Sequence, residues 1–261
     1  MTAPAPAPVT VYWQPGCTSC LRVKQFLADH GVSFESVNVL ADAGARERLA
    51  GFGVRTVPVV TRGAAFVFAQ ELDDVARFLG LPMRGSRLPV PELAARIERL
   101  LALAAEMAAR LPAEHLQSRI AGRDRTYADL CWHIGQIVVG FLDAARGATL
   151  TYKHFERTAP ADLGSADVLV DSLAGIRADF HAWWTAHHTR LPEAVNTYYG
   201  RQPLHQVCER TTWHMAQHCR QLEHILGALD RGHGFLTPEV LAGLPVPRDV
   251  WDREIVPPAE T

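Results

Sequence analysis

Two cysteines, Cys17 and Cys20, are separated by two residues within the segment QPGCTSC, residues 14–20. A strand-like run precedes the pair and a helix-like run follows it, so the first sulfur is expected at a helix N-terminus. The exposed amides there carry partial positive charge and favour thiolate over thiol. Cys17 is therefore predicted to be a nucleophile, and Cys20 to attack a mixed disulfide formed on it. The alternative is half of a zinc site, but the sequence has no second CxxC pair.

Three histidines form a second group with metal-binding spacing. His214 and His218 are four residues apart in TTWHMAQHCRQLEHIL, residues 211–226, and His133 lies in LCWHIGQIVVGFLD. Apolar residues at steps of three or four place all three on inward-facing helical stripes. Imidazoles from two helices can supply three ligands to one ion and leave a position open for water or substrate. Three separate hydrogen-bonded core histidines are the alternative, and each unsatisfied imidazole would cost about 1–3 kcal/mol.

The ligand type narrows the choice of metal. Imidazole nitrogen suits Zn, Ni, Cu and Fe. We expect a divalent ion, and because no carboxylate is among the three ligands we favour Zn, with Ni or Fe as alternatives. Such an ion would deprotonate a thiol in the open position and hold it as a nucleophile at neutral pH.

Composition and net charge limit the partners that the protein is expected to have. The chain has 261 residues, of which 48% are hydrophobic and 21% charged, and its formal net charge is -2. No basic excess indicates a nucleic-acid partner, and no apolar run approaches the roughly 18 residues of a membrane span. Residues 1–8 lack the features of a secretory signal and are expected to be a disordered leader. We therefore expect a cytoplasmic protein with neither nucleic acid nor membrane as a partner.

Hydrophobic periodicity predicts an α+β protein with two domains. Residues 9–81 read as βαβαββα, which predicts a small mixed sheet with helices on its faces. A proline-rich linker follows over residues 82–91. Residues 92–232 then show four long helical runs with no strand between them, which predicts a four-helix bundle. The remaining residues, 233–261, are expected to be an irregular tail.

The first domain resembles the glutaredoxin branch of the thioredoxin fold over residues 9–80. The resemblance is carried by VYWQPGCTSC, by TVP, and by the acidic start of the last helix of the domain. It implies a disulfide reductase or thiol-transfer domain. A low-molecular-weight thiol such as glutathione would then lie along Thr56, Val57, Pro58 and Asp74, with Pro58 in the cis-proline loop.

The second domain resembles the DinB-like helical bundle family over residues 92–232. The three histidines fall on that family's metal-ligand positions, one in the second helix and two in the last. The resemblance implies a metal ion in the bundle and frequently a homodimer. Relatives with known activity include thiol S-transferases, a thiol-dependent isomerase and iron enzymes that join a thiol to another substrate.

Both groups point to thiol chemistry, and three hypotheses follow. The first is a thiol-dependent metalloenzyme that acts on a small-molecule thiol and an unknown second substrate, with the CxxC domain exchanging thiols and disulfides. The second is a glutaredoxin-type oxidoreductase whose bundle only binds a partner or dimerises. The third is a redox or metal sensor, in which oxidation of the cysteine pair changes the packing of the bundle.

Overall fold

The computed structural model describes residues 7–83 and 85–252. Over these residues the chain divides into two compact units. One unit takes in the described residues up to Ser86 together with residues 247–252, and the other takes in residues 87–246. Most of the predicted leader and the last part of the predicted tail, from residue 253, lie outside the described residues.

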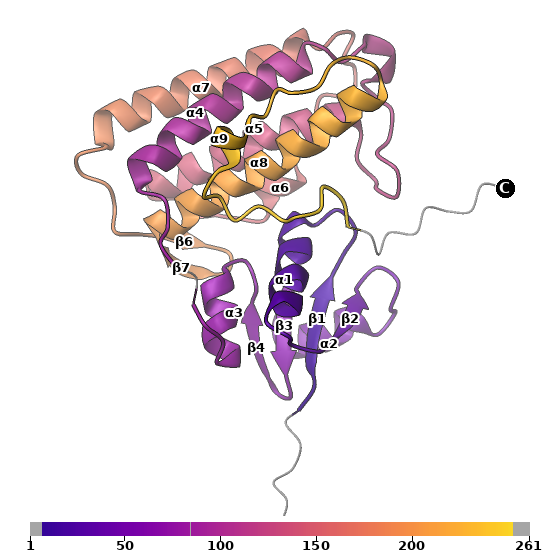
Figure 1. Ribbon diagram of the computed structural model, residues 1–261, viewed down its shortest axis with the longest axis vertical. Coiled ribbons are helices and arrows are strands. Elements are labelled where there is room, and N and C mark those ends of the chain that lie inside the picture. The colour runs from indigo at the N-terminus through magenta and orange to yellow at the C-terminus, as the bar shows by residue number, and fades with distance from the viewer. Residues whose placement is uncertain (1–6, 84, 253–261) are drawn as a thin grey trace, which may run out of the picture. The chain divides into compact units, whose positions relative to one another are not determined.

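The first unit contains a four-stranded sheet (Figure 1). Its elements are β1 (Val9–Trp13), α1 (Thr18–Asp29), β2 (Phe34–Asn38), α2 (Ala45–Gly51), β3 (Val59–Arg62), β4 (Ala65–Phe68) and α3 (Leu72–Leu79). The strand order is β2-β1-β3-β4. β1 runs parallel to β2 and antiparallel to β3, and β3 and β4 form a hairpin. The order of elements matches the predicted βαβαββα.

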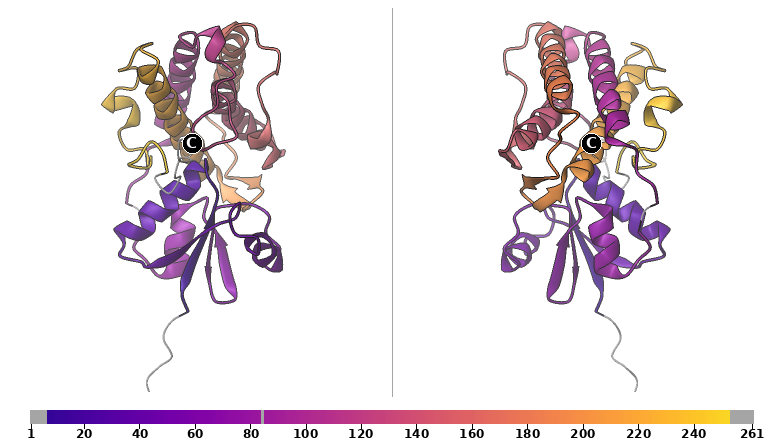
Figure 2. Two further views of the ribbon diagram at one scale, coloured as in Figure 1. Left: turned by 90° about the vertical axis from the view of Figure 1, so that its right-hand side faces the viewer. Right: turned by 90° about the vertical axis from the view of Figure 1, so that its left-hand side faces the viewer.

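The sheet is covered on both faces, with α1 and α3 on one side and α2 on the other (Figure 2). Side chains of β1, α1, β3 and α3 form one apolar cluster. A second cluster joins the end of β1 and Cys20 to α2. Every residue of β1 is buried, as expected for a central strand with helices on both faces. The CxxC segment follows directly from this fixed strand.

The C-terminal residues of the first unit pack against α1. Lys24 forms a buried ion pair with Asp252, with 2.8 Å between Nζ and Oδ2. Gln25 Nε2 donates to Asp249 Oδ2 at 2.9 Å, and Arg248 pairs with Asp29. This segment lies in the predicted irregular tail. It has no regular secondary structure, but a buried lysine needs an anionic partner, and Asp252 supplies one.

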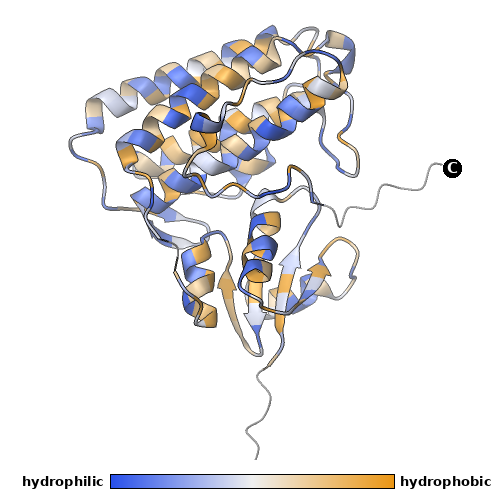
Figure 3. Cartoon of the chain, in the orientation of Figure 1, coloured by the Kyte–Doolittle hydropathy of each residue, from blue (hydrophilic) through white to orange (hydrophobic). Residues whose placement is uncertain are grey.

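The second unit is built on four long helices within the described residues: α4 (Val90–Ala108), α5 (Tyr127–Ala145), α7 (Asp167–His187) and α8 (Leu204–Ala228). α4 and α5 each pack against both α7 and α8. Polar and apolar segments alternate along these helices, as expected for helices that bury one face (Figure 3). A capping box formed by Thr126 and Asp129 begins α5.

Two predictions about this region are wrong. Between the long helices lies a three-stranded sheet of β5 (Thr149–Leu150), β6 (Ala194–Thr197) and β7 (Gly200–Pro203), where no strand was predicted. These strands are two to four residues long, too short to show an alternating pattern. The region predicted as an irregular tail contains the short helix α9 (Pro238–Leu241). The short helix α6 (Lys153–Glu156) also joins α5 to the next part of the bundle.

None of the helices in the described ranges has both the length and the apolar character needed to cross a membrane.

Candidate functional site

The two cysteines of the CxxC segment form a disulfide, with their Cα atoms 5.2 Å apart. Cys17 is the N-cap of α1, and its Sγ accepts a hydrogen bond from the backbone N–H of Cys20 at 3.1 Å. Cys17 is partly exposed, whereas Cys20 is fully buried. This asymmetry makes Cys17 the sulfur that an external disulfide can reach, and the helix N-terminus favours its thiolate once the pair is reduced.

Residues 56–58 are predicted to bind a thiol, and one of them packs in an apolar cluster with this disulfide. Val57 belongs to the apolar cluster that Cys17 and Cys20 also contact, and the peptide bond between Val57 and Pro58 is cis. Gln70 Nε2 donates to the Val57 carbonyl at 3.1 Å and holds that segment in place.

Thr56 and Asp74 are the other two predicted thiol-binding residues. Thr56 is partly buried beside Val57 in the chain. Asp74 lies in the first turn of α3, where its carboxylate pairs with Arg77 at 2.7 Å. A thiol ligand would therefore have to compete with Arg77 for that carboxylate.

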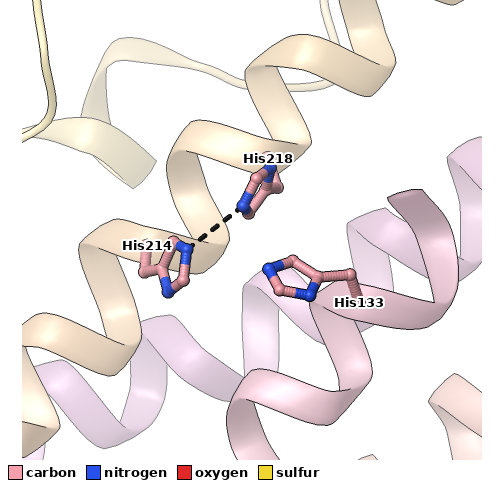
Figure 4. Close-up of side chains that lie close together, drawn as sticks. All are labelled: His133, His214 and His218. Carbon is pink, nitrogen blue, oxygen red and sulfur yellow. Dashed lines mark hydrogen bonds between the residues drawn. The ribbon is translucent and has the colours of Figure 1, made fainter. Parts of the chain in front are cut away.

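The three histidines of the bundle come together between two helices. His133 lies on α5, and His214 and His218 lie on α8, with their rings directed toward one another (Figure 4). One nitrogen of each ring lies within 4.8 Å of the others. The Nε2 atoms of His214 and His218 are 3.2 Å apart. All three side chains are buried, so the cluster is formed in the interior of the unit.

The donor geometry fits a divalent metal ion. Ligand nitrogens about 2.0–2.1 Å from a tetrahedral ion lie about 3.3 Å from one another. The spacing of His214 and His218 is already close to this value, and the third ring needs only a small adjustment. His133 Nδ1 is a buried nitrogen without a hydrogen-bond partner among the described residues. The residues present therefore have the donor type and the approximate spacing that one divalent ion requires.

A neighbouring glutamine sets the tautomer of one ring. His218 Nδ1 lies 2.8 Å from Gln221 Oε1, an acceptor, so Nδ1 carries the proton. The Nε2 lone pair of the neutral ring then faces His214. Such an outer hydrogen bond orients a metal ligand and raises its basicity.

Burial and nearby positive charge keep His133 and His218 neutral. Burial lowers the pKa of His133 and of His218 well below the usual value, and the charge of Arg125 lowers both further. The hydrogen bond from His218 to Gln221 acts in the opposite direction but does not outweigh burial. Neutral imidazole is the form that binds metal ions.

Other histidines and cysteines of the bundle have ordinary structural roles. The ring of buried His154 lies 3.0 Å from Asp143 and 2.9 Å from the Thr151 carbonyl. Burial raises the pKa of Cys131 and of Cys208 to about 12. These thiols stay protonated at neutral pH, which makes them poor nucleophiles.

Sequence reasoning missed two residues beside the histidine cluster. Arg210 is buried on α8, one turn before His214, and its guanidinium lies 5.4 Å from the centre of the Phe155 ring. Phe155 in turn contacts the rings of His133 and His214. The steps of four from Arg210 to His214 and His218 could have revealed the arginine. Nothing local marks Phe155, which reaches the cluster through α6.

The sheet order, the cis-proline loop and the disulfide at the start of α1 define the first unit as a thioredoxin-fold domain of the thiol–disulfide oxidoreductase type. The sequence pattern of the glutaredoxin family matches residues 9–67. The chain is 33% identical to the glutaredoxin-like protein NrdH of Lactococcus lactis subsp. lactis over 54 residues. These residues are 21% of this chain and 75% of NrdH. The chain therefore belongs, through this unit, to the glutaredoxin family.

Two further proteins are similar to part of this chain. The Gene 56 protein of Mycobacterium phage D29 is 46% identical over 39 residues, which are 15% of this chain. The chain spans less than half, 43%, of that phage protein. The chain is 31% identical in sequence to a mutant thioredoxin-like protein of known crystal structure. The match covers 28% of this chain and 96% of that protein, with a TM-score of 0.28.

Proposed function

We propose that the protein is a thiol-dependent metalloenzyme. In this proposal His133, His214 and His218 hold a divalent ion, with Zn favoured over Ni or Fe. The observation that carries it is the convergence of three buried imidazoles from α5 and α8, with ligand nitrogens within 4.8 Å of one another. The resemblance of the bundle to the DinB-like family supports the same ligand set. When bound, the ion would lower the pKa of a coordinated thiol or water and make it a nucleophile.

The residues of the bundle perform the supporting steps. Three imidazoles would hold the ion and would leave a fourth position for a thiol or water if the site is tetrahedral. Gln221 keeps the His218 Nε2 lone pair directed at the site by accepting a hydrogen bond from Nδ1–H. Burial excludes bulk water from the rings and strengthens every charge interaction there.

The glutaredoxin-like unit would supply or recover the thiol. The Cys17 thiolate attacks one sulfur of a disulfide and expels the other sulfur as a thiolate. The Cys20 thiolate then attacks Cys17 in the mixed disulfide and releases the second thiolate, leaving the Cys17–Cys20 disulfide seen in the structure. The substrate gains two electrons and the dithiol loses them. Two molecules of a low-molecular-weight thiol such as glutathione return the dithiol and become a disulfide.

Fusion of the two units links these activities. A tether raises the effective concentration of one site for the product of the other without any new contact. Replacing Cys17 by serine should abolish reduction of a small disulfide, measured with glutathione as the reductant. The second assay supplies only the disulfide and measures how fast the bundle consumes thiol. If this rate were the same in Cys17→Ser as in the wild type, the proposed coupling of the two units would be wrong.

The metal content of the protein, purified without chelators, tests the central part of the proposal. We expect about one ion per chain, lost in His214→Ala. The matched control is His224→Ala, which removes an exposed imidazole from the same helix and should keep the ion. A protein without stoichiometric metal would favour the alternative in which the bundle only binds a partner or dimerises.

A further inference from the structure

A buried glutamine contacts both the helix that begins after Cys17 and the segment predicted to bind a thiol. Gln70 lies between β4 and α3 and is only 1% exposed. Its side-chain Nε2 donates to the backbone carbonyl of Val57 at 3.1 Å. Its own backbone carbonyl accepts a hydrogen bond from Arg22 Nη1, on α1, at 3.5 Å. One residue therefore bonds to the two segments that thiol–disulfide exchange would use.

The side chain of Gln70 replaces a backbone bond at the end of the β3–β4 hairpin. The pairing of the two strands continues for one residue beyond them, where the Ala69 N–H donates to the Pro58 carbonyl at 3.0 Å. At the next position the Val57 carbonyl accepts from the Gln70 side chain and not from a backbone N–H. Two hydrogen bonds thus hold this segment on the residues that follow β4.

The segment held in this way packs in one cluster with the disulfide. Val57 is buried and belongs to the same apolar cluster as Cys20, against which Cys17 also packs. Arg22 is buried two residues beyond Cys20 on α1. The hydrogen bonds of Gln70 are therefore shielded from water, and the loss of one leaves a buried polar group unsatisfied. Such bonds fix the place of the Val57 peptide relative to the two sulfurs.

We infer that Gln70 is a positioning residue for thiol–disulfide exchange at Cys17. It holds the Val57 backbone, along which a disulfide substrate would lie, at a fixed place beside the Cys17 sulfur. In the exchange the Cys17 thiolate bonds to one substrate sulfur, and the other sulfur leaves with the electron pair of the broken S–S bond. The reacting sulfurs have to be close and aligned, so a displaced substrate reacts more slowly. This inference rests on the exchange proposed above for the first unit and on thiol binding by residues 56–58.

Gln70→Met tests this role, because methionine keeps the length of the side chain but has no N–H to donate. The reduced full-length protein is mixed with oxidised glutathione, and its oxidation is followed by acid quenching and mass spectrometry. Iodoacetamide, a small reagent for the Cys17 thiolate, gives the reference rate. We expect the rate with oxidised glutathione to fall about tenfold, as for the loss of one hydrogen bond, while the rate with iodoacetamide stays within about twofold.

Thr10→Val is the matched control. It removes one hydrogen bond of the same unit, from the Thr10 hydroxyl to Glu35 Oε2 at 3.3 Å, and should leave both rates at the wild-type values. An unchanged ratio of the two rates in Gln70→Met would overturn the inference. An equal fall of both rates would overturn it too, because Gln70 would then act on the cysteine or on folding and not on the substrate. Gln70→Leu also lacks the donor and replaces Gln70→Met if that variant is unstable.

Hydrogen exchange separates this inference from the proposed function. The Ala69 N–H, which is bonded to the Pro58 carbonyl, reports on the held segment. Relative to the amides of β1, it should exchange about tenfold faster in Gln70→Met than in the wild type, and no faster in Thr10→Val. If Ala69 responds in this way but oxidised glutathione does not oxidise the wild type, the exchange proposal fails and Gln70 still holds the segment. Equal exchange in wild type and Gln70→Met refutes the positioning role.

Discussion

Replacing Gln221 by leucine should weaken metal binding without removing a ligand. Gln221 Oε1 accepts the Nδ1 proton of His218 at 2.8 Å, and both side chains are 1% exposed. Leucine keeps the volume but accepts no proton, so the imidazole loses the bond that fixes its tautomer and orientation. Loss of such an outer contact costs about 10–100-fold in metal affinity, which corresponds to about 1.4–2.7 kcal/mol.

Competition with a chromophoric zinc chelator measures this difference directly. Gln217→Leu is the matched control, because Gln217 is equally buried on α8 but accepts from Arg220 at 2.7 Å. Its zinc affinity should stay within about threefold of the wild type. Gln221→Glu keeps an acceptor at the same place and should restore most of the affinity. Equal zinc affinities for wild type and Gln221→Leu, at matched thermal stability, would refute the role given to this hydrogen bond.

Three further predictions concern thiol reactivity, pH and folding. Burial raises the pKa of Cys131 to about 12, so iodoacetamide at pH 8 should modify the reduced native protein at Cys17 and leave Cys131 unmodified. Mass spectrometry checks this, and the unfolded protein should be modified at Cys131 as well. Because the pKa values of His133 and His218 are lowered on folding, the metal-free protein should lose stability as pH falls below about 6.5. The loss is at most about 1.4 kcal/mol per pH unit for each histidine, and a flat urea midpoint between pH 7.5 and 5.5 would contradict it. Lys24→Met should destabilise the first unit by about 3–5 kcal/mol, because the Asp252 carboxylate is then buried without its partner. Adding Asp252→Asn should recover much of that loss, as measured by a double-mutant cycle of unfolding free energies.

Features that depend on the local spacing of apolar residues could be predicted from the sequence. The strand before Cys17 and the helix after it follow from runs of apolar residues, and these place the cysteine at a helix N-terminus. The inward stripe of α8 carries His214 and His218 because steps of four return to one face of a helix. For the same reason His133 could be assigned to the interior.

Features that depend on contacts between distant segments could not be predicted. Asp252 lies in a segment without regular structure, and only the fold brings it to Lys24. The strands β5 to β7 are too short to leave a pattern in the sequence. Phe155 contacts two of the histidine rings from a short helix, so no spacing along the chain reveals it.

X-ray absorption at the metal edge of the stoichiometrically loaded protein tests the central claim most directly. We predict three imidazole nitrogens at about 2.0 Å in the absence of added thiol. Addition of 3-mercaptopropionate should then introduce one sulfur at about 2.3 Å. Fewer than three imidazoles, or a sulfur ligand before any thiol is added, would contradict a site formed by His133, His214 and His218.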